Sequence, residues 1–203
     1  MLFEDTYHTI EKPSEGIFRD RGSKFLAYAF PVNSESELKT CLAQLKTSHP
    51  KANHHCWAMR LSIDRSVFRL NDDGEPSGTA GRPILNTLLS CDLTNLAVIV
   101  VRYFGGTLLG VPGLINAYKS ATEEALKQAV IIEKTVNDVY TVEFDYLQMN
   151  DVMRIIKEDN LNIVSQAFDN NCAIQVLIRK TQVNQTLAKL NKLNAGVKYN
   201  YTI

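Results

Sequence analysis

Hydrophobic and polar positions in the last third of the chain follow two periods in a fixed order. Apolar side chains at every second position predict strands, and spacings of three and four predict helices. The alternating segments are 140–144, 163–168, 172–178 and 197–203. Helical spacing occurs between the first two and between the last two, at Val152, Ile155 and Ile156 and at Val183, Leu187 and Leu190. The predicted order is βαββαβ, the ferredoxin-like plan.

The preceding part of the chain is also mixed but less regular. Ser34 and Glu37 have the spacing of a capping box ahead of a helix that ends before Pro50. The segment 96–101 is continuously apolar, which is typical of a central strand covered on both faces. Further strands are expected at 25–32, 54–63 and 66–70, and further helices at 83–89 and 111–129. We expect Asp64 and Arg65 to join a hairpin, and residues 169–171 to form a turn.

These elements predict an α+β protein of two domains, residues 1–133 and 138–203. The boundary falls between Ile132 and Val139, where Glu133-Lys134-Thr135 interrupts two apolar segments.

Composition limits the electrostatic functions. Among 203 residues, 22 basic side chains balance 22 acidic ones, so no overall field drives the chain onto nucleic acid or anionic lipid. Any electrostatic function must therefore be local. The cysteines form no Cys-x-x-Cys pair, and no segment has the length and apolar character of a signal peptide or a membrane span. We expect a cytoplasmic location and no membrane partner, and the oligomeric state stays open.

Two glycine-rich segments are the main candidates for chemistry. Seven of the ten glycines lie between Gly74 and Gly113, in the clusters 72–83 and 102–113, each ahead of an expected helix. Such loops expose backbone N–H groups at a helix start, where a phosphate or carboxylate binds. Alternatively, the glycines serve only tight turns and close packing. The anion-binding interpretation assigns a site to the cations Arg82, Arg102 and Lys119 and to Gly78, Thr79, Gly81, Gly105 and Gly106.

Three shorter patterns allow two interpretations each. Asp72, Asp73 and Glu75 have the chemistry of a Mg²⁺ site, or form a solvated acidic turn. Residues 54–56, His-His-Cys, suggest zinc or Cys–His catalysis, or mark a strand that crosses from core to surface. Alternation on a strand directs His54 and Cys56 to one side and His55 to the other, which favours the second interpretation. Residues 19–24 form either a basic patch with aromatic neighbours or a solvated hairpin tip.

Both glycine clusters resemble the motifs of the IMPACT/YigZ family. The matching segments are Phe68-Arg69-Leu70-Asn71-Asp72-Asp73-Gly74-Glu75-Pro76-Ser77-Gly78-Thr79-Ala80-Gly81-Arg82-Pro83-Ile84-Leu85 and Val100-Val101-Arg102-Tyr103-Phe104-Gly105-Gly106-Thr107-Leu108-Leu109-Gly110. Gly113-Leu114-Ile115-x-Ala117-Tyr118, Ser23-Lys24-Phe25-Leu26-Ala27 and His54-x-Cys56-x-Ala58-x-Arg60 extend the resemblance.

The resemblance implies a fold and a field of function. It implies an Impact N-terminal-type domain that is similar to domain 2 of ribosomal protein S5, followed by a ferredoxin-like domain similar to the C-terminal domain of elongation factor G. Eukaryotic members of the family act in translational control, and bacterial members have no settled biochemical activity. The resemblance therefore implies a role linked to translation.

Two hypotheses of function follow. The first, which we favour, is a non-enzymatic protein that binds structured RNA or ribosomal and translation components through phosphates, with no cofactor and no DNA sequence specificity. It predicts that Arg82→Ala and Arg102→Ala each flatten the salt dependence of RNA binding by about one unit. The second is a phosphotransferase or other enzyme for a phosphorylated small molecule, in which residues 105–113 cradle a phosphate and Asp73 or Glu75 holds Mg²⁺.

Overall fold

The structure, a computed structural model, describes residues 5–62, 66–168 and 172–203. It separates into two compact units, one formed by Tyr7–Lys134 and the other by Thr135–Ile203 together with Asp5 and Thr6. A mixed α+β protein of two domains is thus confirmed. The hairpin connection at Asp64 and Arg65 and the turn at 169–171 lie outside the described residues.

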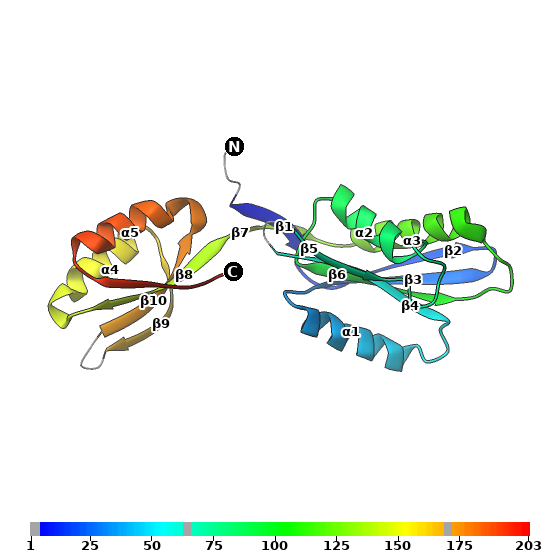
Figure 1. Cartoon of the computed structure of the whole chain (residues 1–203), viewed down its shortest axis with the longest axis horizontal. Coiled ribbons are helices and arrows are strands. Elements are labelled where there is room, and N and C mark those ends of the chain that lie inside the picture. The colour runs from blue at the N-terminus through cyan, green and yellow to red at the C-terminus, as the bar shows by residue number, and fades with distance from the viewer. Residues whose placement is uncertain (1–4, 63–65, 169–171) are drawn as a thin grey trace. The chain divides into compact units, whose positions relative to one another are not determined.

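The N-terminal unit is built around an antiparallel sheet of five strands (Figure 1). Its spatial order is β2-β3-β6-β4-β5. The strands are β2 (Ser14–Asp20), β3 (Ser23–Pro31), β4 (His54–Leu61), β5 (Val67–Asn71) and β6 (Leu96–Tyr103). The strands β3 to β6 correspond to the four segments predicted as strands in this part of the chain.

Helices cover both faces of this sheet. On one face α1 (Glu35–Ser48) packs through Leu38 and Leu45, and on the other lie α2 (Gly81–Ser90) and α3 (Gly110–Lys127). The central strand β6 is buried at all positions from Leu96 to Arg102, so the prediction of a doubly covered strand is confirmed. Strand β6 alternates its side chains between two separate cores, which is why its sequence is continuously apolar.

Local signals also determine where α1 begins and ends. The Ser34 side chain accepts a hydrogen bond from the Glu37 N–H, and the Glu37 carboxylate accepts one from the Asn33 N–H. His49 caps the other end, where its backbone N–H donates to the Leu45 carbonyl. The predicted capping interaction at Ser34 is therefore present, with Asn33 rather than Ser34 as the return donor.

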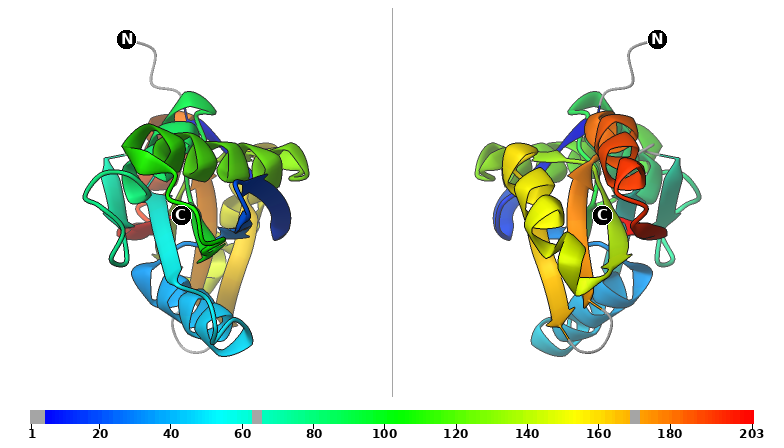
Figure 2. Two further views of the ribbon diagram at one scale, coloured as in Figure 1. Left: turned by 90° about the vertical axis from the view of Figure 1, so that its right-hand side faces the viewer. Right: turned by 90° about the vertical axis from the view of Figure 1, so that its left-hand side faces the viewer.

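The C-terminal unit has the predicted βαββαβ order. Its sheet is arranged β11-β8-β10-β9, with all neighbours antiparallel, which is the strand order of a ferredoxin-like fold. Figure 2 shows its two helices on one face of the sheet. The elements are β8 (Asn137–Phe144), α4 (Met149–Glu158), β9 (Asn162–Phe168), β10 (Cys172–Arg179), α5 (Val183–Lys192) and β11 (Gly196–Thr202). Short 3₁₀ turns, Tyr146–Gln148 and Lys180–Gln182, precede α4 and α5.

Three strands were not predicted, namely β2 and two short strands of five residues each. Strand β1 (Thr6–Ile10) pairs with β7 (Ile131–Thr135) in a separate two-stranded sheet. Next to β1, the carboxylate of Asp5 accepts two hydrogen bonds from the Arg179 guanidinium, at 2.7 and 2.9 Å, and one from the Thr181 hydroxyl. Asp5 thus belongs to the C-terminal unit although it is 174 residues from Arg179 in sequence.

Candidate anion-binding site

Both glycine-rich loops emerge at one end of the five-stranded sheet. Arg102, at the end of β6, is paired with His54 at the start of β4, and Trp57 of β4 is paired with Asn71 at the end of β5. The loops that follow Asn71 and Tyr103 therefore start side by side. The antiparallel register, and not any local signal, brings together segments that are about 30 residues apart.

A buried ion pair connects the two loops. The Arg102 guanidinium donates to the Glu75 carboxylate at 2.5 Å, and their side chains are 7% and 3% exposed. The Tyr118 hydroxyl of α3 donates to the same carboxylate oxygen at 2.8 Å. Arg102 also lies over the rings of Phe25 and Phe104. Its charge is neutralised inside the protein, so Arg102 holds the loops together and is not presented to an external anion.

The amides ahead of α2 already have an anionic acceptor. One Asp72 carboxylate oxygen accepts from the N–H groups of Ala80 and Gly81, at 3.1 and 2.8 Å, and the other accepts from the Gly78 N–H at 2.9 Å. Asp72 therefore occupies the position at the helix start that the sequence interpretation assigns to a ligand. The Thr79 hydroxyl donates to the Pro76 carbonyl and is buried, so it is also engaged within the loop.

The carboxylates proposed for Mg²⁺ are separated by their partners. Asp72 binds the amides of the loop, Glu75 binds Arg102 and Tyr118, and Asp73 accepts from the His55 N–H at 2.6 Å. Within the described part of the chain, no group of three or more His, Cys, Asp or Glu side chains is arranged to hold a metal ion. These carboxylates serve the packing of the loop.

The second glycine loop packs closely on the turn between β2 and β3. The Gly105 N–H donates to the Ser23 hydroxyl, and a Cβ at Gly105 would lie 1.9 Å from the Gly22 carbonyl carbon. Gly105 is therefore required for close backbone packing. Gly106 has a φ of +87° and open space around it.

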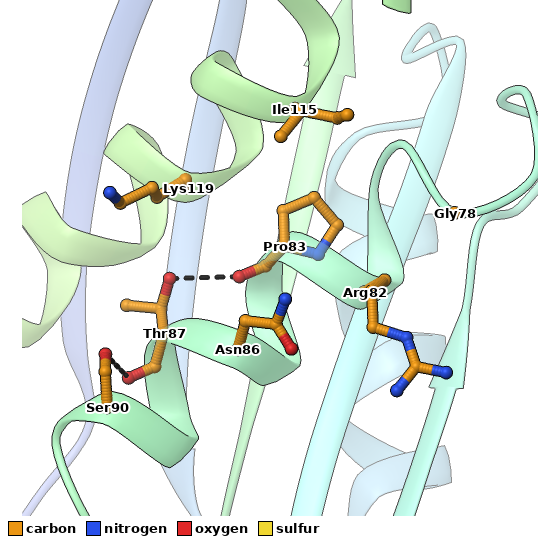
Figure 3. A pocket seen from close by; sticks show the side chains of 8 residues that line it. All are labelled: Gly78, Arg82, Pro83, Asn86, Thr87, Ser90, Ile115 and Lys119. Atoms are coloured by element: carbon orange, nitrogen blue, oxygen red, sulfur yellow. Dashed lines mark hydrogen bonds between the residues drawn. The ribbon is translucent and has the colours of Figure 1, made fainter. Parts of the chain in front are cut away.

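Arg82 and Lys119 line a groove between α2 and α3. The groove has a volume of about 410 Å³ and is lined by Gly78, Arg82, Pro83, Asn86, Thr87, Ser90, Ile115 and Lys119. Figure 3 shows Lys119 at one side and Arg82 at the other, with Pro83 and Asn86 between them. Arg82 is exposed, and within the ranges that the structure describes it has no ion pair or hydrogen bond. Lys119 has an exposed pairing with Glu123 at 3.7 Å.

A second basic surface lies at the hairpin of β2 and β3. Arg19 and Lys24 are paired across the strands, and Arg21 and Gly22 form a two-residue turn with φ values of +44° and +79°. Positive φ at both positions is the geometry of a type I′ turn. A shallow hollow of about 420 Å³ is lined by residues 19–24. The segment is thus a hairpin tip, and it presents three cations beside one acid, Asp20.

The structure therefore divides the predicted site residues into two groups. Arg82, Lys119 and Gly78 line one groove, whereas Arg102, Thr79, Gly81 and Gly105 form the internal framework of the loops. The buried network that Tyr118 and Cys56 complete was not predicted from the sequence: the Cys56 thiol donates to the Tyr118 hydroxyl at 3.2 Å. Burial raises the pKa of both groups well above their usual values, so neither is an activated nucleophile or base. Arg102 follows the continuously apolar run Leu96–Val101 of β6, and this pattern is the sequence signal for a buried acidic partner such as Glu75.

Comparison with known proteins gives the class to which this fold and these loops belong. The model of the Impact N-terminal domain matches residues 21–126, which includes both glycine loops. An IMPACT family member from Haemophilus influenzae is 32% identical over 86% of this chain and 85% of its own length. The IMPACT family member YigZ of Escherichia coli is 30% identical over 86% of both chains.

A solved structure extends the likeness to both units. The crystal structure of a hypothetical protein, 26% identical in sequence, covers 96% of this chain and 97% of its own with a TM-score of 0.75. The chain belongs to the IMPACT family. No helix among the described residues is long and apolar enough to cross a membrane.

Proposed function

We propose that this chain is a non-enzymatic binding protein that docks on structured RNA, such as ribosomal RNA, and acts in translation. One observation carries the proposal: Arg82, a cation to which the described residues offer no partner, lies across an open groove from Lys119. A phosphate contact needs an accessible cation, and Arg82 and Lys119 satisfy that requirement where Arg102 does not.

The placement of the charges favours a polyanion over a small phosphorylated molecule. Arg82 and Lys119 stand at opposite sides of the groove and do not converge on one point. Separate cations suit successive phosphates along a nucleic-acid backbone, whereas a single phosphate group requires convergent donors. The exposed Asn86 between them offers a polar side chain for sugar and phosphate contacts, whereas the Thr87 and Ser90 hydroxyls donate to the Pro83 and Thr87 carbonyls.

The enzyme hypothesis has less support. In the loop at 102–113, the N–H groups of Phe104 and Gly105 donate to Asn53 and Ser23. Asp73 and Glu75 are engaged with His55 and Arg102, so the phosphate cradle and the Mg²⁺ ligands of that hypothesis have other partners. The role in translation that the family resemblance implies supports RNA of the translation machinery as the ligand.

Fluorescence anisotropy with a labelled RNA hairpin over a range of KCl concentrations tests the proposal. We expect the plot of log affinity against log salt to be linear, and Arg82→Ala and Lys119→Ala each to reduce its slope by about one unit. Lys39→Ala is the matched control, because Lys39 is an exposed lysine on α1, which covers the opposite face of the sheet.

Two results would contradict the proposal. One is the absence of RNA binding at low salt. The other is an equal effect of Lys39→Ala and Arg82→Ala, which would indicate attraction without a site. A thermal-shift measurement with nucleotides and Mg²⁺ tests the enzyme alternative, since a ligand at 100 times its dissociation constant adds about 2.7 kcal/mol of stability.

A further inference from the structure

Strand β9 forms an open edge of the C-terminal sheet. It lies beside β10 alone (Figure 1), and all seven of its residues, Asn162–Phe168, are exposed. Ile163, Val164 and Phe168 are 39%, 48% and 46% exposed. The register shifts once, beside Val164, and from Ser165 to Phe168 the pairing with β10 is regular. The outer side of β9 therefore offers a run of backbone donors and acceptors without a strand partner among the described residues.

The other edges of the two larger sheets carry charges that oppose strand addition. Strand β2 has Glu15, Arg19 and Asp20, β5 has Arg69, and β11 has Lys198. Strand β9, with the sequence NIVSQAF, has no charged residue and no proline. Natural proteins protect edge strands with such residues, because an unprotected edge recruits another strand. Among these four edges, β9 alone lacks that protection.

An apolar hollow lies beside the start of β9. It has a volume of about 480 Å³ and is lined by Met153, Ile156, Lys157, Asn160, Leu161 and Asn162. Met153 is 36% exposed, so an apolar side chain entering the hollow would cover surface that is now in water. Lys157 has no ion pair or hydrogen bond to any residue that the structure describes. The hollow thus combines an apolar floor with one unneutralised cation.

We propose that β9 and this hollow bind an extended segment of a partner protein. The segment adds to β9 as a fifth strand, places one apolar side chain over Met153 and Ile156, and directs an adjacent carboxylate toward Lys157. Main-chain hydrogen bonds to an edge strand provide affinity, and a pocket for a single side chain provides selectivity. The positive charge of Lys157 argues for an acidic residue next to the apolar anchor.

Synthetic peptides test this inference with the full-length chain. The probe is an octapeptide of alternating Val and Thr that ends in Leu-Asp. Control peptides replace the Asp with Lys or carry N-methyl groups on alternate amides. Binding is followed by fluorescence anisotropy and by amide chemical shifts of the ¹⁵N-labelled protein. We expect shifts in β9 and α4, and loss of binding by the N-methylated peptide because it cannot donate to the edge.

Three variants separate the roles of the surface. Val164→Lys places a charge on the edge and should weaken binding about tenfold or more. Lys157→Glu should reverse the preference from the Asp peptide to the Lys peptide. Tyr199→Lys, at a side chain 52% exposed on the opposite edge, is the matched control and should leave binding unchanged.

Shifts confined to other surfaces, or binding that Val164→Lys leaves unaffected, would overturn the inference. A concentration-dependent dimer that Val164→Lys abolishes would also overturn it, because the occupant of the edge would then be a second copy of the chain. This surface and the groove at Arg82 are in different units, so RNA binding should be unchanged in all three variants.

Discussion

Removal of the positive charge from the Arg102–Glu75 pair should destabilise the N-terminal unit strongly. In Arg102→Met, the Glu75 carboxylate keeps one hydrogen-bond donor among the described residues, the Tyr118 hydroxyl, with His54 Nε2 at 3.9 Å, while its side chain is only 3% exposed. An isolated buried charge destabilises the folded state by far more than the ion pair stabilises it. Loss of one partner of a buried pair typically lowers the free energy of unfolding by about 3–5 kcal/mol. Methionine retains much of the arginine's packing volume, so most of this loss should be electrostatic.

Trp57 provides a selective assay for this prediction. It is the only tryptophan in the chain and lies on β4, so its fluorescence reports unfolding of the N-terminal unit. Urea unfolding of Arg102→Met, of Glu75→Gln and of the double variant forms a thermodynamic cycle. In Glu75→Gln the side-chain amide oxygen can still accept from the Tyr118 hydroxyl. We expect a coupling of about 2–3 kcal/mol, with the double variant more stable than the summed losses predict.

Two results would refute the reasoning. If Arg102→Met lowers the free energy of unfolding by less than about 1 kcal/mol, the ion pair is not effectively buried. If the two single losses add in the double variant, Arg102 and Glu75 do not stabilise the loops through one another. RNA binding at a salt concentration where all variants are folded should be little affected, because neither side chain is exposed to a ligand.

Three further predictions concern other parts of the chain. The Arg179 guanidinium holds the pKa of Asp5 well below its usual range, so Asp5→Asn should lower the stability of the C-terminal unit at pH 7. The difference in free energy of unfolding between the variant and the unsubstituted protein should shrink progressively as the pH falls below about 4. Urea unfolding followed by circular dichroism measures it. A thiol reagent should label exposed Cys91 rapidly in the native protein but label Cys56, which is buried and whose pKa is raised by burial, only on unfolding; equal rates would contradict the fold. Gly105→Ala should prevent folding of the N-terminal unit, because the added Cβ would clash with the backbone at Gly22. Gly106 has open space around it and only a positive φ, so Gly106→Ala should lower the free energy of unfolding by about 1–2 kcal/mol, measured by urea unfolding followed by Trp57 fluorescence.

Local periodicity explains which parts of the fold were predictable. Strand β6 and the βαββαβ order were identified because each element carries a dense pattern of apolar positions. Strands β1 and β7 are only five residues long, and β7 is largely exposed, so neither has a pattern distinct from a loop. Their pairing is a long-range contact, which no window along the sequence contains.

The candidate site was only partly predictable for a related reason. The carboxylate of Asp72 and the amides of Gly78 and Gly81 were each recognised, one as a metal ligand and the others as an anion site. They satisfy one another in the folded loop. Whether two complementary groups bind each other or external ligands depends on the path of the backbone between them, and periodicity does not describe that path.

The contact between Asp5 and Arg179 makes the folding of one unit depend on the other. In an unfolded chain this contact closes a loop of 174 residues. Once the N-terminal unit has folded, the pairing of β1 with β7 holds Thr6 near Thr135, so the remaining flexible loop is roughly the stretch from Thr135 to Arg179. The entropy of loop closure depends on the logarithm of loop length, and this shortening lowers its cost by about 1 kcal/mol. By holding Thr6 and Thr135 together through the β1–β7 pairing, the N-terminal unit therefore stabilises the C-terminal unit through chain entropy.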